Sequence, residues 1–324
     1  MLLPLHDAEA ERYAGFLLST LPELITLPVA RSDRNATLDA SLGHGFALGR
    51  RGLGIELGVY RGRSLRRAAR RFPHRHFVGF DSLQGFPEDG RPDWTLDFTV
   101  PAPPRLPSNC ELRLGWFHDT LPDFAATCAE PVIWLNIDCD IYSSAHQGLT
   151  LLRPLLRPGT VLHMDEALNY DGWLWNEMLA LFRFLEATGM GVRWLARSGH
   201  VRDLPTTLAF LEAGRYPTWS DDVISGFHRE AALALTPRNT ALARLRESAP
   251  RSLLAEFGAR LQARTRAYLD GSQVRTDCDP FDMVAPAPRL GSWRRLLRKL
   301  PGRLGAPMRA PSTSGQGGTV LPSG

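Results

Sequence analysis

The sequence predicts an α/β fold, a doubly wound sheet of mostly parallel strands, on two observations. Between residues 52 and 214, short apolar runs alternate with segments of helical spacing. The pattern closes with two strands in succession, which predicts an antiparallel edge strand. Because crossovers between parallel strands are right-handed, helices should cover both faces of the sheet.

Each expected element follows from its local pattern. The fourth strand is almost wholly apolar, as a buried central parallel strand should be, and glycine or proline ends several helices. The expected strands span 54–57, 76–80, 111–114, 132–137, 160–164, 191–197 and 206–211. The expected helices span 8–21, 32–42, 64–71, 144–156, 173–188, 221–235 and 239–269.

Changes in composition divide the chain into four parts. We expect an N-terminal helical segment over 1–50, the α/β core over 51–215 and a helical extension over 216–284. Residues 285–324 are basic and rich in Pro, Gly and Ser, so we expect them to be disordered.

Charge and composition disfavour several classes of protein. The net charge is +4, but seven basic residues and no acid follow Asp282, so the rest of the chain carries −3. A nucleic-acid enzyme would concentrate positive charge on its catalytic domain. We find neither a long apolar run nor a secretory signal, so we expect no transmembrane span. Four widely spaced cysteines favour a reducing, cytoplasmic location.

Two strand ends have the features of a nucleotide-like site. The first strand leads through Glu56, Gly58 and Gly62 into a helix, and such a turn lets a ligand approach the main chain closely. The second strand ends in Asp81, whose carboxylate can accept two hydrogen bonds from a ribose diol. Both NAD and S-adenosylmethionine (SAM) carry that diol. The turn lacks the GxGxxG pattern and contains an acid that suits a cationic amino-acid moiety, which favours SAM.

Acidic residues follow the next two central strands. Asp138 and Asp140 follow the fourth strand, and Asp165 and Glu166 follow the fifth. Neighbouring parallel strands end at one edge of the sheet, so these acids should face one crevice. Close carboxylates repel one another unless they are protonated or bridged by a cation, and an all-oxygen set suits Mg²⁺ or Ca²⁺. The alternative is that these acids merely cap the segments that follow them.

Five ordered blocks of the sequence resemble the macrocin O-methyltransferase (TylF-type) family of class I SAM-dependent methyltransferases. The blocks are IELGVYRGRSL (55–65), VGFDSLQGFPED (78–89), LGWFHDTLP (114–122), LNIDCDIYSS (135–144) and MDEALNYDGWLWNE (164–177). The resemblance implies a seven-stranded Rossmann-like sheet with SAM as the methyl donor. It also implies a divalent metal such as Mg²⁺ and a sugar hydroxyl as the acceptor, as is frequent in the family.

The resemblance further implies roles for individual residues. The implied SAM-binding residues are Glu56, Gly58, Gly62, Asp81, Ser82, Gly115 and Trp116. The implied metal ligands are Asp138, Asp165 and Glu166. Sugar-modifying members of the family tend to have a second Asp in place of Glu166, and this difference leaves the metal and the acceptor open.

The candidate catalytic residues are Asp138, Asp140 and His163, because each lies near the end of a central strand. A general base would help to remove the proton of an acceptor hydroxyl. His163 lies on an apolar strand, so a buried structural histidine is an equal alternative. His146 begins a helix and is a further candidate base, with a solvated side chain as its alternative.

An aromatic run offers a candidate wall for the acceptor. Tyr170, Trp173 and Trp175 could stack on a sugar face, and ordinary helix packing is the alternative. The small-molecule acceptor itself is not readable from these residues, and assembly into a homo-oligomer is left open.

Three functions therefore compete. The first is metal-assisted O-methylation of a small glycosylated or polyhydroxylated molecule. The second is metal-independent methyl transfer from SAM to another acceptor. The third is a non-catalytic scaffold that retains the fold and binds a partner through its basic tail. An NAD-dependent dehydrogenase is disfavoured, because GxGxxG is absent and the single lysine, Lys299, lies in the tail.

Overall fold

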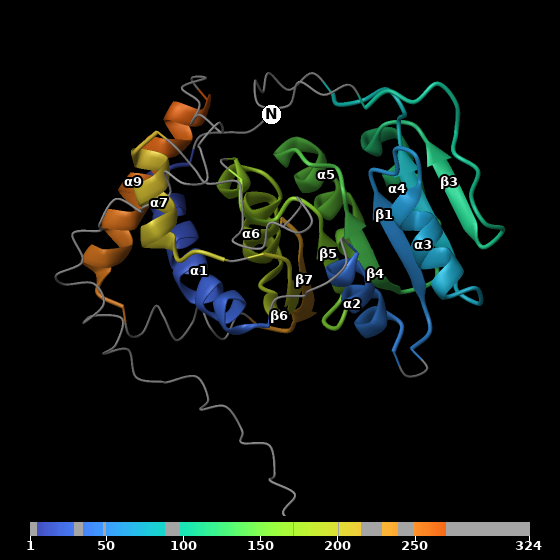
Figure 1. Cartoon of the computed structure of the whole chain (residues 1–324), viewed down its shortest axis with the longest axis horizontal. Coiled ribbons are helices and arrows are strands. Elements are labelled where there is room, and N and C mark those ends of the chain that lie inside the picture. The colour runs from blue at the N-terminus through green and yellow to red at the C-terminus, as the bar shows by residue number, and fades with distance from the viewer. Residues whose placement is uncertain are drawn as a thin grey trace, which may run out of the picture. The chain divides into compact units, whose positions relative to one another are not determined.

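A computed structural model describes residues 5–28, 35–47, 50–87, 98–170, 172–199, 201–214, 229–238 and 249–269 (Figure 1). The predicted disordered tail over 285–324 lies outside the described residues, as do parts of the expected helices at 32–34, 221–228 and 239–248. Among the described residues, no helix has the length and apolar character needed to cross a membrane.

A seven-stranded sheet forms the core, which confirms the predicted fold class. The strand order is β3-β2-β1-β4-β5-β7-β6. All neighbouring strands run parallel except β7, which is antiparallel to both β5 and β6. The strands are β1 (Leu53–Leu57), β2 (Phe77–Asp81), β3 (Cys110–Leu114), β4 (Val132–Ile137), β5 (Val161–Met164), β6 (Gly191–Arg197) and β7 (Ala231–Thr236).

The last strand is not where the sequence predicted it. Residues 206–211 belong to helix α7 (Leu204–Glu212), because Asp203 accepts a hydrogen bond from the Thr206 amide and Pro205 occupies the first turn. The seventh strand is instead β7, in a segment that we expected to be helical. Its residues are buried between β5 and β6, so tertiary pairing overrides the helix propensity of Ala and Leu. The sheet thus extends past residue 215.

Helices cover both faces of this sheet. Helices α2 and α3 pack on one face, and α4, α5 and α6 form a packed layer on the other, as right-handed crossovers require. The single helix expected over 173–188 is broken at Asn176 into the short 3₁₀ turn η2 (Trp173–Trp175) and α6. Besides α7, the described α-helices are α1 (Asp7–Thr26), α2 (Ala36–Gly45), α3 (Arg63–Arg71), α4 (Phe117–Thr127), α5 (Tyr142–Leu152), α6 (Glu177–Thr188) and α9 (Arg251–Leu269).

The N-terminal helix and the last described helix lie side by side (Figure 1). At Gly258 of α9, an added Cβ would lie 2.9 Å from the Glu11 amide nitrogen of α1, so the two backbones touch there. Gln262 of α9 also donates a hydrogen bond of 2.6 Å to Asp7. The two expected helical flanking segments therefore form one helical pair beside the sheet.

The direction of strand progression reverses between β1 and β4. From β1 the chain moves outward through β2 and β3, and from β4 it moves the other way through β5. Ligands bind in the crevice at the carboxyl ends of strands at such a switch point. Here Gly58 follows β1 with φ 84°, and an added Cβ would lie 1.9 Å from the Asp138 carbonyl oxygen. Only glycine lets the two strand ends approach this closely.

Candidate active site

A cavity of about 1210 Å³ opens at the switch point between β1 and β4. Its walls come from the loops after β1, β2, β3, β4 and β5, from α5, and from the residues that precede β7. Most of the predicted site residues line it: Gly58, Asp81, Ser82, Gly115, Trp116, Asp138, Asp140, His146, His163, Asp165 and Glu166. The cavity is thus built where the topology predicts a ligand.

Asp81 fastens the loop after β1 to the end of β2. One carboxylate oxygen accepts hydrogen bonds from the Val59 and Tyr60 amides at 2.7 and 2.6 Å, and the other accepts one from the Leu83 amide at 2.6 Å. A carboxylate has about four acceptor positions, so Asp81 retains capacity toward the cavity that it lines. Gly62 begins α3 in the left-handed conformation and closes the same loop through its amide, which donates to the Val59 carbonyl.

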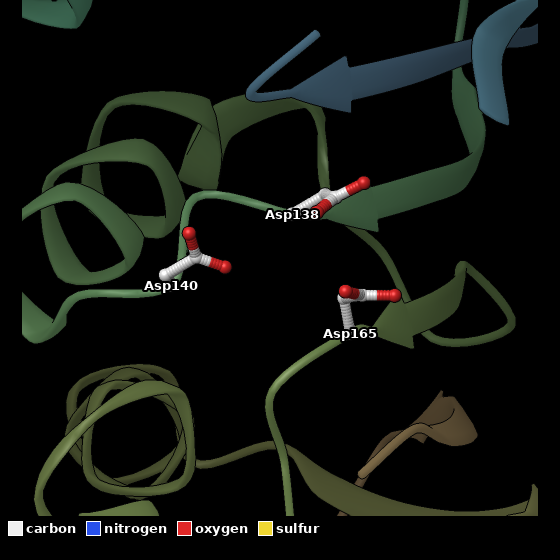
Figure 2. Close-up of side chains that lie close together, drawn as sticks. All are labelled: Asp138, Asp140 and Asp165. Atoms are coloured by element: carbon white, nitrogen blue, oxygen red, sulfur yellow. The ribbon is translucent and has the colours of Figure 1, made fainter. Parts of the chain in front are cut away.

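Three carboxylates meet on the β4–β5 side of the cavity. Asp138 directly follows β4, Asp140 lies two residues further on, and Asp165 directly follows β5. Figure 2 shows the three side chains around one common space. One oxygen from each can be chosen such that all three lie within 4.8 Å of one another. Asp140 reaches this place because its backbone has φ 60°, a left-handed conformation that Asp tolerates better than most residues.

Burial and mutual repulsion raise the pKa values of two of these carboxyls, Asp138 and Asp140. Burial, followed by the Asp165 and Asp140 charges, raises the pKa of Asp138 well above its ordinary value. Burial and the Asp165 charge raise the pKa of Asp140 to about 7, against the opposing effect of Arg229. A hard cation would relieve this repulsion, and a set of carboxylate oxygens is the donor chemistry that Mg²⁺ prefers. The three residues therefore fit a divalent cation.

Glu166 has a different partner. Its two oxygens lie 3.1 and 3.0 Å from a guanidinium nitrogen of Arg229, and its amide donates to Glu177 at 3.2 Å. Among the described residues, the acids with convergent oxygens are Asp138, Asp140 and Asp165, so Asp140 stands where the resemblance had placed Glu166. The predicted metal role of Glu166 stays a prediction.

Glu56 lies below the cavity wall and is fully buried. It accepts hydrogen bonds from the Ser64 hydroxyl at 2.9 Å and from the Asn136 amide group at 3.0 Å. Burial raises its pKa to about 8, with smaller contributions from Asp165 and Asp81. A direct contact between Glu56 and SAM stays a prediction.

The two candidate histidines differ in their surroundings. His163 is 2 % exposed and burial lowers its pKa to about 3, so it stays neutral at physiological pH and is a weak base. His146 is partly buried and stacks on Tyr142 at 5.2 Å, and burial lowers its pKa as well.

For the aromatic run, the structure favours the packing alternative over an acceptor wall, because the cavity lining formed by the described residues does not include it. Tyr170, Trp173 and Trp175 are at most 4 % exposed. Trp175 stacks on Tyr268 of α9 at 5.0 Å and donates a hydrogen bond of 2.7 Å to Thr265, which is the helix-packing alternative. Aromatic side chains from other loops line the cavity instead: Tyr60, Phe86, Phe98, Trp116, Phe117 and Tyr142.

Arg229 and Asn136 are among the polar residues of the cavity wall that the sequence alone did not single out. Arg229 lies in a segment in which the sequence indicates no candidate functional residue, and it belongs to no recognisable motif. Asn136 did leave a signal, because it lies two residues before Asp138 on the same strand. Residues two apart share a face of a strand, so Asn136 had to lie directly beneath that acid.

Comparison with known proteins agrees with this geometry. Residues 55–167 match the family model described as a methyltransferase domain. This segment includes Asp81, Asp138, Asp140 and Asp165. A search of the curated proteins finds no match.

Solved structures with a detectable likeness are distant. The calicheamicin methyltransferase CalS11 is 19 % identical, with 72 % of this chain and 95 % of that chain covered and a TM-score of 0.42. The O-methyltransferase NovP is 16 % identical, with 72 % and 100 % covered and a TM-score of 0.40. An O-methyltransferase from Bacillus cereus in complex with SAH is 15 % identical, with 70 % and 90 % covered and a TM-score of 0.37. The site described above lies largely within residues 55–167, the segment that matches the methyltransferase-domain model.

Proposed function

We propose that this chain is a SAM-dependent methyltransferase that acts on a hydroxyl group of a small polyhydroxylated or glycosylated molecule. The observation that carries the proposal is the single cavity at the switch point, which Asp81 and the three aspartates share. Asp81 has the position and chemistry to bind a ribose diol. The match of residues 55–167 to a methyltransferase domain supports the reaction class, and the wide cysteine spacing favours a cytoplasmic location.

In the favoured form of this proposal, Asp138, Asp140 and Asp165 would hold a Mg²⁺ ion. The ion would supply Lewis acidity that lowers the pKa of an acceptor hydroxyl. The protein would hold the hydroxyl oxygen in line with the methyl group, and much of the rate gain in such a transfer comes from positioning. Trp116 and Phe117 would help to exclude water from the cavity that they line.

A second candidate is methyl transfer without metal, and Arg229 favours it. Its guanidinium is paired with Glu166 and its charge lowers the pKa of Asp140, so a fixed cation already lies near the acids. In this form Asp140, with a pKa of about 7, is the group suited to take the proton of the hydroxyl. The two candidates therefore assign Asp140 different roles.

Calorimetric titration with S-adenosylhomocysteine (SAH), with NAD⁺ as the control ligand, tests the proposal. We expect micromolar binding of SAH and none of NAD⁺, and we expect Asp81→Asn to weaken SAH binding. The matched control is Asp123→Asn, which changes an exposed acid on α4. Folded protein that binds no SAH would refute the methyltransferase proposal.

Paramagnetic Mn²⁺, followed by electron paramagnetic resonance, separates the two candidates. In the metal-assisted form, wild type and Asp123→Asn bind Mn²⁺ and Asp165→Asn does not. Turnover of SAM against a panel of glycosides and polyols is then lost in EDTA. Turnover that persists in EDTA, and falls with Asp140→Asn, would establish the metal-independent form.

A further inference from the structure

A row of three buried polar side chains lies one step below the rim of the cavity, on the strands that lead to Gly58, Asp138 and Asp165. Glu56 of β1, Asn136 of β4 and His163 of β5 are register partners across adjacent parallel strands. Their exposed fractions are 0 %, 1 % and 2 %. Each lies two residues before a residue of the cavity rim, so the row shares the face of the sheet that leads into the site.

Hydrogen bonding fixes the direction of every group in the row. One oxygen of the Glu56 carboxyl group accepts a hydrogen bond from the Ser64 hydroxyl, and the other accepts one from the Asn136 side-chain nitrogen, at 2.9 and 3.0 Å. The Asn136 side-chain oxygen therefore points the other way, toward His163 Nδ1 at 2.6 Å. An oxygen that only accepts requires a donor, so Nδ1 carries the hydrogen and Nε2 carries the lone pair.

The Nε2 atom of His163 is buried and lacks a hydrogen-bond partner within the described part of the chain. Across the antiparallel pair, its register partner on β7 is Ala232, whose methyl group offers no donor. The His163 residue nevertheless lines the cavity. A buried acceptor without a partner costs about 1–3 kcal/mol, so the site is built to receive a donor at this atom.

We propose that Asn136 is a positioning residue that holds His163 as the neutral Nδ1–H tautomer, so that Nε2 accepts a hydrogen bond from a hydroxyl of the bound methyl acceptor. The identity of the donor rests on the proposed function, whereas the tautomer does not. The ring is 2 % exposed and its Nδ1–H is engaged by the Asn136 oxygen, so Nε2 is the atom left to accept a hydrogen bond. His163 then orients the acceptor, and removal of the hydroxyl proton falls to another group.

Nitrogen NMR of the full chain with ¹⁵N-labelled histidine tests the tautomer. His163→Gln identifies the His163 signals by their disappearance. In wild type, we expect a protonated Nδ1 and an unprotonated Nε2. Asn136→Leu keeps the size of the side chain and removes its oxygen, so the protonated nitrogen should change to Nε2. Gln147→Leu, which removes another amide of the cavity wall, should leave the His163 signals unchanged. A protonated Nε2 in wild type, or a tautomer indifferent to Asn136→Leu, would overturn the proposal.

His163→Asn tests the acceptor role, because it keeps an amide donor near the Nδ1 position and has no atom at the Nε2 position. With an acceptor found in the turnover panel, we expect its KM to rise at least about fivefold, while the affinity for SAH stays unchanged. An unchanged KM would overturn the acceptor role. SAH binding by wild type, measured on the same samples, reports separately on the proposed function: its absence refutes the methyltransferase, and the NMR result then stands or falls alone.

Discussion

Gly58→Ala should separate the ends of β1 and β4 and so damage the binding cavity. The added Cβ would lie 1.9 Å from the Asp138 carbonyl oxygen, a backbone atom, so the two strand ends must move apart by about 1 Å. Overpacking of this kind costs about 1–3 kcal/mol. The left-handed φ of 84° adds about 1 kcal/mol for a residue with a Cβ. We therefore expect a total loss of about 3 kcal/mol in the free energy of unfolding.

A second glycine provides the matched control. Gly189 ends α6 with φ 71°, and an added Cβ would meet nothing within 4 Å. Gly189→Ala thus has the same backbone strain without the collision, and it should cost about 1 kcal/mol.

Urea unfolding and SAH calorimetry measure the two effects. Gly58→Ala should also weaken SAH binding at least about tenfold, because the displaced strand ends form the cavity floor, whereas Gly189→Ala should bind SAH as wild type does. If Gly58→Ala is as stable as Gly189→Ala and binds SAH normally, the close approach of β1 and β4 does not shape the site.

Three further predictions concern buried polar groups. Burial raises the pKa of Glu56 from 4.5 to about 8, so between these pH values the folded state holds a proton that the unfolded state has lost. The free energy of unfolding should therefore fall by a few kcal/mol, as an order of magnitude, when the pH rises through this window. Urea unfolding of Glu56→Gln from pH 5 to 8 should show a smaller decrease in this free energy than wild type does, and an equal decrease would contradict the assignment. Arg229→Met leaves Glu166, which is 5 % exposed, without its cation. We expect the free energy of unfolding to fall by about 2 kcal/mol at pH 8, by less at pH 5, and to recover in the double variant with Glu166→Leu. A decrease that does not depend on pH would argue against an ion pair. Trp175→Phe removes the hydrogen bond to Thr265, and neither residue lines the cavity. Unfolding should cost about 1 kcal/mol less, with the KM of the methyl acceptor unchanged, and a higher KM would restore the aromatic-wall hypothesis.

Local patterns predicted the strands that define the switch point. Strands β1 to β5 were predicted within one or two residues, because apolar runs that end in Gly or Asp have few other structures available. The last strand failed because AALALT, residues 231–236, consists mostly of good helix formers, and only its neighbours in the sheet make it extended.

The site was predictable to the extent that it follows from topology. Asp81 ends β2, and Asp138 and Asp165 directly follow β4 and β5, so the strand order alone brings them to one edge. The features of the site that were not predicted depend on the conformation of a single residue or on a partner distant in the sequence. A left-handed backbone turns Asp140 into the group, and Arg229, 63 positions along the chain, engages Glu166. Neither effect has a signature in local sequence.

The pairing of α1 with α9 has a consequence for how the chain reaches its native state. Gln262 and Asp7 are 255 positions apart, yet they are hydrogen bonded in the finished fold. During synthesis, α1 emerges before α9, so the side of α1 that α9 covers has no partner until α9 is made. Contacts this distant in sequence slow folding, because a long loop must close before they form. We expect the sheet to assemble before α1 and α9 pair, so the nascent chain passes through a stage in which the site region is ordered and the α9-facing side of α1 is still exposed.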